Sequence, residues 1–536
     1  MNQKQLKRAI CLSICAATLA GGLSSCSTKQ PGSMESSQTA SQPASAGISY
    51  DGTGPIAENT VELSILTTNG ASRVIDYENM QWQQEILNRA NVKLNMEMID
   101  PSSYADVIKP RLAAATDLPD IVLVQGNDQD LSYINSGIFL DLTSYYDSYG
   151  VNLKQRFEEN PGLKSEVTTP DGKIYYVPFI YLTVDWCRSI MVNQPWLDEL
   201  GLDHPKDMDE FYELLKAIQN ADLNHNGEND EIPLFMRKGY TELMGTFWGL
   251  DLSFGYKREE DGTVTCSYIQ PEYRNFLEYF NKLYSEGLLY SEFSTADLDT
   301  QNALFSNNQI GVIEHFLSNC TGYSKQIDPE WGFNVDDPIM QPILPPTGPY
   351  GDAYYYGRDP LGAIFAITKD CTQPELAFCF MDYLYNPEIA ELAWYGFEGT
   401  DYNVVDGKIE FTDVYLSNED NYRGKMGYNF EGLPGLQIPG SYGATQCDQI
   451  MAANEEIRKY AKNPIGFSYT LPEEKETIQS YKTDLHTYFS EMFVGFITGT
   501  TPLNDQTWES YLANVNAMHA DDITAVYQAM VDRQSE

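Results

Sequence analysis

Three stretches carry the strongest structural pattern of the chain: VELSILTTNG at residues 61–70, QWQQEILNRANVKLNMEMI at residues 81–99 and DIVLV at residues 120–124. Apolar residues alternate in residues 61–65 and 92–98, and residues 120–124 are almost wholly apolar, so three strands are predicted. Apolar residues also recur at helical spacing between these strands, at Trp82, Ile86, Leu87 and Ala90 and at Tyr104, Val107, Ile108 and Leu112. This β-α-β-α-β order predicts an α/β fold with a parallel sheet covered by helices.

Ligands of open α/β sheets bind beyond the carboxyl ends of the strands. Those ends fall here at residues 67–69 and 125–128, so Asn69 and Asp128 are candidate ligand-binding residues. Further along the chain, residues 362–367 form a predicted strand and residues 374–385 a predicted helix. Two amphipathic helices are predicted near the C-terminus, with faces formed by Trp508, Tyr511, Leu512 and Val515 and by Ile523, Val526, Tyr527 and Met530.

The composition limits the classes of partner. The chain has 536 residues, 34 Lys and Arg against 77 Asp and Glu, and a formal net charge of −43. An apolar fraction of 42% is enough for a sizeable core and excludes a mainly disordered chain. The acidity argues against nucleic acid as a partner and against electrostatic docking on anionic lipid, since both need Lys and Arg.

The first 26 residues resemble a lipoprotein signal. A positive start with Lys4, Lys7 and Arg8 precedes an apolar stretch at residues 10–23 that is too short to span a bilayer. Residues 23–26 (LSSC) resemble a bacterial lipobox, which implies cleavage after residue 25 and acylation of Cys26. The Ser-rich residues after it lack apolar side chains, so residues 26–59 are predicted to be a lipidated Cys and a flexible tether.

Six other cysteines are scattered through the exported part. They show no CxxC or Cys/His metal spacing, so buried thiols are expected rather than a disulfide framework. They are Cys187, Cys266, Cys320, Cys371, Cys379 and Cys447.

A calcium loop is predicted at residues 222–231 (DLNHNGENDE), after an amphipathic helix. Oxygen-bearing side chains stand at positions 1, 3, 5 and 9, with a glycine at position 6, which is the spacing of an EF-hand loop. Position 12 is Pro233 rather than Glu, so another acid must complete the shell; the alternative is a polar Asn/Gly turn. The candidate metal residues are Asp222, Asn224, Asn226, Glu228, Asp230 and Glu231.

No catalytic motif was found. The sequence has no GxSxG, no HExxH and no Cys/His pair with recognisable spacing, and its five His are scattered. Because Asp and Glu are so abundant, a chance pair of carboxylates is no evidence for glycoside hydrolysis. We therefore predict no catalytic residue.

Several segments resemble the extracellular solute-binding protein family 1, the substrate-binding lipoproteins of ABC importers that include sugar-binding members. They are residues 112–123 (LAAATDLPDIVL), 171–178 (DGKIYYVP), 195–215 (PWLDELGLDHPKDMDEFYELL), 395–402 (YGFEGTDY) and 496–511 (FITGTTPLNDQTWESY). Their order along the chain makes the set specific. Relatives in this family carry a DxNxNGxxDE segment, so the resemblance also supports a bound, structural Ca²⁺.

The resemblance implies a two-lobed, periplasmic-binding-protein-like (type II) fold with hinge-linked lobes and ligand held between them. Crossings between lobes are expected near residues 184–191, near 340–345 and after Trp394. Lobe 1 is then 60–184 with 340–395, and lobe 2 is 185–339 with 396–536.

Ligand-binding residues are expected at the crossings and strand ends, where aromatic rings can stack on sugar faces and polar groups can pair with hydroxyls. For any single aromatic residue, core packing is the commoner role. The candidates, besides Asn69 and Asp128, are Asp185, Trp186, Arg188, Glu314, Phe316, Tyr356, Arg358 and Trp394.

The resemblance thus predicts a lipid-anchored receptor on the extracellular face of the cell membrane. It would bind a sugar or oligosaccharide as a monomer and deliver it to the transmembrane subunits of an ABC permease, with the lipid as its membrane attachment. A secreted glycan-degrading lipoprotein and a receptor for peptides or other solutes are the alternatives. Sequence leaves the identity, linkage and length of the ligand open.

Overall fold

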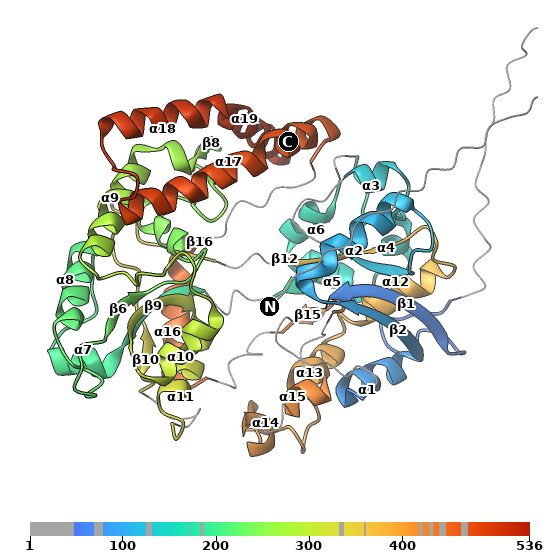
Figure 1. Ribbon diagram of the computed structural model, residues 1–536. Helices are drawn as coiled ribbons and strands as arrows, with labels where there is room; N and C mark the ends of the chain where they lie inside the picture. The colour runs from blue at the N-terminus through green and yellow to red at the C-terminus, as the bar shows by residue number, and fades with distance from the viewer. Residues whose placement is uncertain are drawn as a thin grey trace, which may run out of the picture. The chain divides into compact units, whose positions relative to one another are not determined.

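The computed structural model describes most of the chain after residue 47. The described residues are 48–68, 79–124, 131–169, 171–182, 187–331, 337–357, 361–417, 422–427, 432–438, 446–462 and 470–535. They form two α/β lobes, each built on its own sheet and its own hydrophobic core. Figure 1 shows the helices and strands of both.

The sheet of lobe 1 has six strands in the order β15-β4-β12-β3-β1-β2. Their bounds are β1 (Val61–Thr68), β2 (Val92–Ile99), β3 (Ile121–Val124), β4 (Val177–Tyr181), β12 (Leu361–Ile367) and β15 (Leu436–Gln437). Strand β1 lies parallel to β2 and to β3, which confirms the predicted parallel β-α-β-α-β unit. Strand β12, whose direction the sequence left open, runs antiparallel to β3 and β4.

Ten helices contribute side chains to the core of lobe 1 among the described residues. They are α1 (Gln81–Ala90), α2 (Pro101–Ala114), α3 (Leu131–Asn135), α4 (Thr143–Tyr149), α5 (Asn152–Glu159), α6 (Pro161–Val167), α12 (Pro374–Tyr383), α13 (Pro387–Tyr395), α14 (Asp413–Ser417) and α15 (Tyr422–Met426). In α1 every predicted core residue is buried, because Trp82, Ile86, Leu87 and Ala90 share one helix face. Asp100 caps α2 by accepting a hydrogen bond from the Ser102 amide.

The sheet of lobe 2 has four strands in the order β10-β5-β9-β6. Their bounds are β5 (Arg188–Asn193), β6 (Ile232–Phe235), β9 (Ile310–Phe316) and β10 (Met340–Pro342). Strands β6 and β9 are parallel, whereas β5 is antiparallel to β9 and to β10. All six residues of β5 are buried, as expected for an inner strand.

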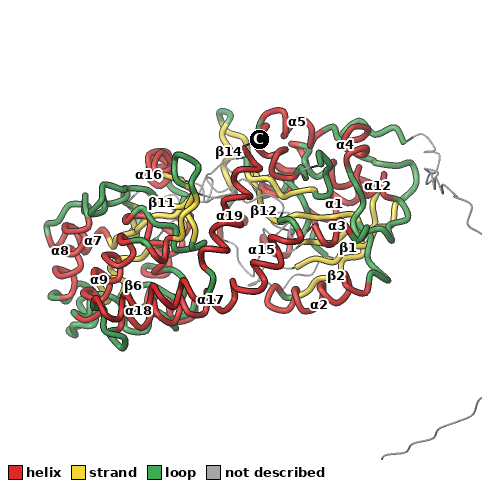
Figure 2. The backbone as a smooth tube through the Cα atoms, turned by 90° about the horizontal axis from the view of Figure 1, so that it is seen from above, coloured by secondary structure: helices red, strands yellow, loops and turns green. Residues whose placement is uncertain are grey.

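Helices supply much of the core of lobe 2, and helices flank the strands of each sheet in Figure 2. They are α7 (Gln194–Leu200), α8 (Met208–Gln219), α9 (Pro271–Ser285), α10 (Leu298–Ser306), α11 (Cys320–Ile327), α16 (Asp448–Ile457), α17 (Pro472–Thr498), α18 (Asp505–Ala517) and α19 (Ala520–Ser535). The predicted faces of α18 and α19 are confirmed in part, since Trp508, Tyr511, Val515, Ile523, Tyr527 and Met530 are buried. Short elements complete this lobe: the 3₁₀ helices η1 (Thr241–Trp248) and η3 (Leu317–Asn319), and strands β7 (Tyr256–Arg258), β8 (Val264–Cys266), β11 (Tyr355–Tyr356) and β16 (Ala461–Lys462).

The lobe boundaries predicted from sequence differ from sheet and core membership in two places. Strands β10 and β11 were assigned to lobe 1, but β10 pairs with β5 in the sheet of lobe 2 and Tyr355 of β11 lies in the core of lobe 2. Residues 396–438 were assigned to lobe 2, but their hairpin β13 (Tyr402–Val405) and β14 (Lys408–Phe411), helices α14 and α15, and strand β15 all add side chains to the core of lobe 1. Hydrophobic pattern alone could not show this, because either core accepts the same apolar side chains.

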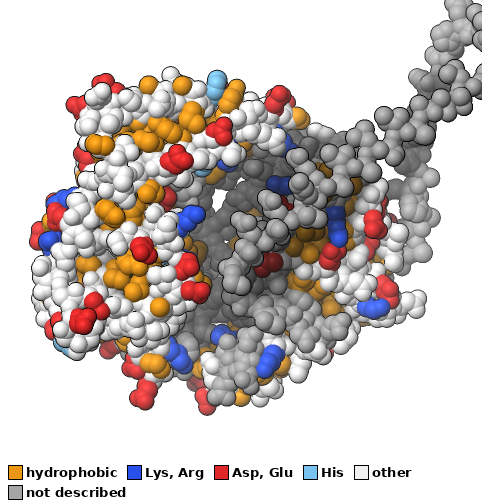
Figure 3. Space-filling view, in the orientation of Figure 1, with side chains coloured by type: hydrophobic (Ala, Val, Ile, Leu, Met, Phe, Trp, Pro, Cys, Tyr) orange, Lys and Arg blue, Asp and Glu red, His pale blue; other side chains and the backbone are white. Residues whose placement is uncertain are grey.

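The six cysteines between residues 187 and 447 are buried, as the sequence predicts. Acidic side chains are scattered over the face seen in Figure 3, in keeping with the net charge of −43. Within the described part of the chain, no helix combines the length and the apolar character needed to cross a membrane.

Candidate ligand-binding site

The carboxyl edge of the lobe 2 sheet gathers polar and aromatic side chains. Strands β6 and β9 are parallel, so both end at this edge, and β5 begins there because Arg188 pairs in register with Phe316. Glu314, His315 and Phe316 form the end of β9, and Arg237 follows β6 by two residues. This edge is where ligands of such sheets bind.

A buried ion pair is the centre of this edge. The Arg188 Nε and Nη2 atoms donate to the Glu314 Oε1 and Oε2 atoms, both at 2.7 Å. Only 10% of the Arg188 side chain and 3% of the Glu314 side chain are exposed. The guanidinium carbon also lies 4.7 Å from the ring centre of Tyr240 and 4.5 Å from that of Phe316. Burial opposes the charge of Arg188, but Glu314 outweighs it, and the pKa of Arg188 lies above its ordinary value.

A second arginine lies beside this pair. Arg237 Nη2 donates to the Tyr240 hydroxyl and, at 3.2 Å, to His315 Nε2. Burial and the charges of Arg188 and Arg237 lower the pKa of His315 to about 3, so its imidazole is neutral at physiological pH. The other ring nitrogen, Nδ1, lies 2.8 Å from the side-chain amide nitrogen of Asn319. The Tyr240 and His315 rings stack with centres 5.4 Å apart.

The cluster therefore offers charged donors beside aromatic faces. Tyr240 and Phe316 are half-buried, so part of each ring remains accessible. Of the sequence candidates, Arg188, Glu314 and Phe316 come together here, and this grouping can hold a polar ligand with flat apolar faces, such as a sugar ring.

Other candidates lie elsewhere. Tyr356 is 8% exposed, and its hydroxyl donates to Asp251 Oδ1 at 2.8 Å. Burial raises the pKa of Asp251. The remaining candidates, Asn69, Asp128, Asp185, Trp186 and Arg358, lie outside the described residues, as do the signal and Cys26.

The stacking role predicted for Trp394 needs correction. This residue is 0% exposed in the core of lobe 1, and its indole N–H donates to the Leu436 carbonyl at 2.8 Å. Its ring offers no free face, because α13 turns it inward. The neighbouring YGFEGTDY loop stabilises the packing of lobe 1. Its residue Asp401, also 0% exposed, accepts hydrogen bonds from the Trp82 indole at 3.0 Å and from the Tyr422 hydroxyl at 2.6 Å.

The loop at residues 222–231 has the turns that the sequence suggests. The Asn224 and Asn226 side-chain oxygens accept from the backbone amides of Asn226 and Glu228, and Gly227 adopts a φ of +86°. Asp230 Oδ1 accepts from both asparagine side chains at 3.0 Å, and the first of these bonds is the main reason that the pKa of Asp230 is lowered.

Two carboxylate oxygens in this loop are without a hydrogen-bond donor among the described residues. Asp222 Oδ1 and Glu231 Oε2 are buried and accept no hydrogen bond from the residues that the structure describes. Glu231 Oε1 accepts from the amides of Leu223 and Asn224, which directs the other oxygen away from them. Among the described residues, no group of three or more His, Cys, Asp and Glu side chains is arranged to hold a metal. A cation here would need the asparagine and backbone oxygens as well.

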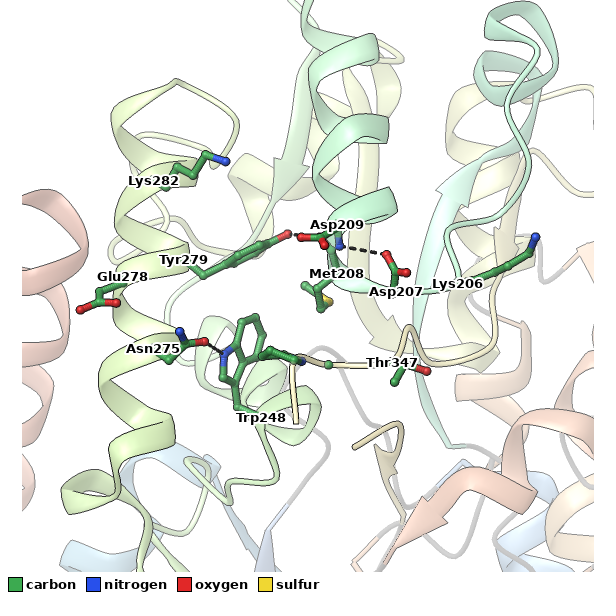
Figure 4. A pocket seen from close by; sticks show the side chains of 12 residues that line it. Lys206, Asp207, Met208, Asp209, Trp248, Asn275, Glu278, Tyr279, Lys282 and Thr347 are labelled. Atoms are coloured by element: carbon green, nitrogen blue, oxygen red, sulfur yellow. Dashed lines mark hydrogen bonds between the residues drawn. The ribbon is translucent and has the colours of Figure 1, made fainter. Parts of the chain in front are cut away.

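Lobe 2 also has an open pocket of about 670 Å³, away from the residues above. Figure 4 shows it between the start of α8 and the exposed side of α9, with Trp248 and Tyr279 inside and Lys206, Asp207, Asp209, Glu278 and Lys282 around them. The polar groups of its rings are already used: the Trp248 indole donates to Asn275 and the Tyr279 hydroxyl to the Met208 carbonyl, both at 2.8 Å. It therefore offers less specific recognition than the sheet edge.

A family model described as bacterial extracellular solute-binding protein matches residues 77–391. The chain belongs to this family. The match includes β6, β9 and the ion pair between Arg188 and Glu314, so the candidate site lies within the family region. Members of this family are binding proteins.

Two relatives show the extent of similarity in sequence. The lipoprotein LipO of Bacillus subtilis is 28% identical over 363 residues, which cover 65% of this chain and 68% of LipO. The fructooligosaccharide ABC transporter substrate-binding protein FusA of Streptococcus pneumoniae is 30% identical over 289 residues, which cover 51% of each chain. The aligned part thus spans about two thirds of the first relative and half of the second.

Solved structures are similar in fold to this chain over most of its length. The alginate-binding protein AlgQ2, solved without calcium ion, has a TM-score of 0.72 at 21% identity and covers 89% of this chain and 99% of AlgQ2. An EF-hand mutant of FusA in complex with fructo-nystose has a TM-score of 0.71 at 20% identity and the same coverage. This likeness confirms the two-lobed fold predicted from sequence.

Sequence reasoning missed Arg237 and Tyr240. Both follow β6, and a strand end was a signal that could have found them, since the same rule led to Asn69 and Asp128. Between Arg237 and Tyr240 lies Gly239 with a φ of +81°, which lets the chain turn and bring the ring of Tyr240 over both Arg188 and Arg237.

Proposed function

We propose that this chain is the substrate-binding component of an ABC importer for carbohydrates, with an oligosaccharide as ligand. The observation that carries the proposal is the edge of the lobe 2 sheet. There Arg188, paired with Glu314, lies over the rings of Tyr240 and Phe316, and Arg237 lies over the ring of Tyr240. FusA, by its name a fructooligosaccharide-binding protein, supports the ligand class. Closure of the two lobes would capture the ligand, and an ABC permease would receive it.

Isothermal titration of residues 27–536 against a panel of oligosaccharides tests this proposal. We expect at least one glycan to bind with a one-to-one stoichiometry and without release of reducing sugar. Tight binding of peptides with no response to any glycan would contradict the carbohydrate ligand, and steady release of reducing sugar would instead support the glycan-degrading alternative.

We propose further that Cys26 carries the lipid that holds the protein at the extracellular face of the membrane. The lipobox and the positive n-region support this, and LipO is named as a lipoprotein. In a bacterial host fed a palmitate analogue, Cys26→Ser is expected to abolish labelling and release the protein into the medium, because acyl chains are the only anchor proposed. The matched control is Cys15→Ser within the signal, which should leave labelling intact; equal labelling of both variants would contradict the assignment.

We propose a structural Ca²⁺ at residues 222–231. Asp222, Asn224, Asn226, Asp230 and Glu231 would hold it together with the Glu228 carbonyl, and the ion would neutralise the loop's carboxylates and stabilise lobe 2. AlgQ2, solved without calcium ion, and FusA, solved as an EF-hand mutant, support this reading. The two buried oxygens of Asp222 and Glu231 without hydrogen bonds are its basis in this chain.

Removal of calcium tests the loop directly. At a Ca²⁺ concentration a hundred times its Kd, the native state gains about 2.7 kcal/mol over the chelated protein, so chelation should lower the melting temperature. The variant Asp222→Asn should melt at the chelated temperature with or without Ca²⁺. Asp261→Asn, in another exposed Asp turn, should keep the full response. A melting temperature that does not change with Ca²⁺ in the unaltered protein would contradict the site.

A further inference from the structure

Arg237 has no acidic partner, unlike its neighbour. The Arg188 guanidinium is paired with Glu314, but among the described residues no carboxylate lies within 4.0 Å of Arg237. Its partners are neutral: the Tyr240 hydroxyl, the Tyr240 ring at 4.1 Å and His315 Nε2. A guanidinium stays protonated in proteins, so the charge of Arg237 has no counter-charge among the described residues, on a protein of net charge −43.

The donors of Arg237 are also incompletely used. Among the residues that the structure describes, its buried Nε atom has no hydrogen-bond acceptor, Nη1 donates to none, and Nη2 makes both hydrogen bonds. A buried N–H without an acceptor destabilises a protein unless a partner arrives. The site therefore contains a positive charge and free donors at the edge where a ligand of this sheet binds.

A negatively charged ligand group would supply both the acceptors and the counter-charge. A neutral sugar placed over Arg237 would remove water from the guanidinium and supply hydroxyls but no counter-charge, which is unfavourable for a buried ion. A planar carboxylate supplies both, because its two oxygens match the guanidinium fork. Glu314 does not supply this counter-charge to Arg237, because both of its oxygens already accept hydrogen bonds from Arg188.

We propose that the ligand is an acidic oligosaccharide and that Arg237 binds the carboxylate of one of its uronic acid residues, with Tyr240 and Phe316 beside the sugar rings. This rests on the proposed function and specifies its ligand class. The ion pair of Arg188 and Glu314 holds the aromatic rings of Tyr240 and Phe316 in place, while Arg237 makes the charged contact with the ligand carboxylate.

Matched ligands test the inference without any mutation. Isothermal titration of residues 27–536 would use trimers of galacturonate, glucuronate and mannuronate, their carboxyl-reduced neutral counterparts, and a sulfated neutral trimer. We expect at least one uronate trimer to bind, and its reduced counterpart to bind about 10- to 100-fold more weakly, the loss typical of one charged hydrogen-bonded contact.

The outcomes separate the two proposals. Equal binding of a uronate and its reduced counterpart, or binding of neutral glycans alone, would overturn the acidic ligand and leave the carbohydrate receptor standing. Binding of the sulfated trimer in preference to every uronate would overturn the carboxylate assignment. Failure of every glycan to bind would overturn the proposed function with it.

Variants then assign the contact to Arg237. Arg237→Gln should weaken uronate binding about 10- to 100-fold and bring the acid and its reduced counterpart to within about twofold, with Arg237→Lys between this variant and the unaltered protein. Lys238→Gln removes the same charge at the adjacent, exposed position and should change nothing. An unchanged preference for the acid in Arg237→Gln would overturn the assignment; thermal melts of each variant exclude loss of fold as the cause.

Discussion

Replacing Glu314 by Ala is expected to lower the free energy of unfolding of lobe 2 by about 3–5 kcal/mol and to abolish ligand binding. The change leaves the guanidinium of Arg188 buried between two rings with no counter-charge, and breaking one side of a buried ion pair has a cost of this order. The exposed fractions of 10% for Arg188 and 3% for Glu314 justify treating the pair as buried. Urea unfolding followed by fluorescence measures the change.

Arg111 and Glu97 provide a matched control in lobe 1. They form the same two-bond pair, at 2.7 and 2.8 Å, but their side chains are 37% and 45% exposed. Because water solvates the remaining charge, Glu97→Ala should cost no more than about 1 kcal/mol. A similar cost for both variants would show that the Arg188 pair is not desolvated.

A double variant separates folding from binding at this site. Arg188→Met with Glu314→Leu replaces the pair by apolar side chains of similar volume, which is often neutral or stabilising for a buried pair. We expect stability close to that of the unaltered protein and no detectable ligand binding. Retained binding would show that the pair has no part in recognition.

The sequence predicted the first three strands and the helices between them well because their signals were local. Alternating apolar residues in β1 and β2, the buried run of β3 and the helical faces of α1 and α2 each depend on neighbours in the chain, and all agree with one another. The return of residues 396–438 to lobe 1 depends instead on contacts far apart in sequence, such as the hydrogen bond of Trp82 to Asp401. No short-range pattern contains that information.

The site could be predicted in part for the same reason. Arg188, Glu314 and Phe316 were found through strand ends and expected crossings, and the structure brings them together. Trp394 followed the same reasoning but is buried, since a tryptophan in the last turn of a helix fits a core and a cleft equally well. Arg237 could be recognised as a candidate ligand-binding residue only from the structure, which shows that Glu314 pairs with Arg188 instead.

Acid is expected to destabilise lobe 2 through His315. Burial and the two arginines hold the folded pKa near 3, whereas an unfolded histidine titrates near 6.5. Between these values the unfolded chain binds a proton that the native site does not, so the free energy of unfolding falls as the pH drops. The slope is about 1.4 kcal/mol per pH unit, which gives a loss of about 2–3 kcal/mol from this residue between pH 6.5 and 4.5.

The contribution of His315 to the pH dependence of the free energy of unfolding can be isolated by comparing variants, because the many carboxylates contribute equally in all of them. Urea unfolding at pH 7 and pH 4.5 should show His315→Asn losing about 2–3 kcal/mol less stability than the unaltered protein. His225→Asn is the control: its side chain is 67% exposed, and Asn tolerates the φ of +57° at that position. It should follow the unaltered protein at both pH values. If His315→Asn also loses as much stability as the unaltered protein, His315 accepts a proton in the native state, and the positive charge at this edge is then not confined to the arginines.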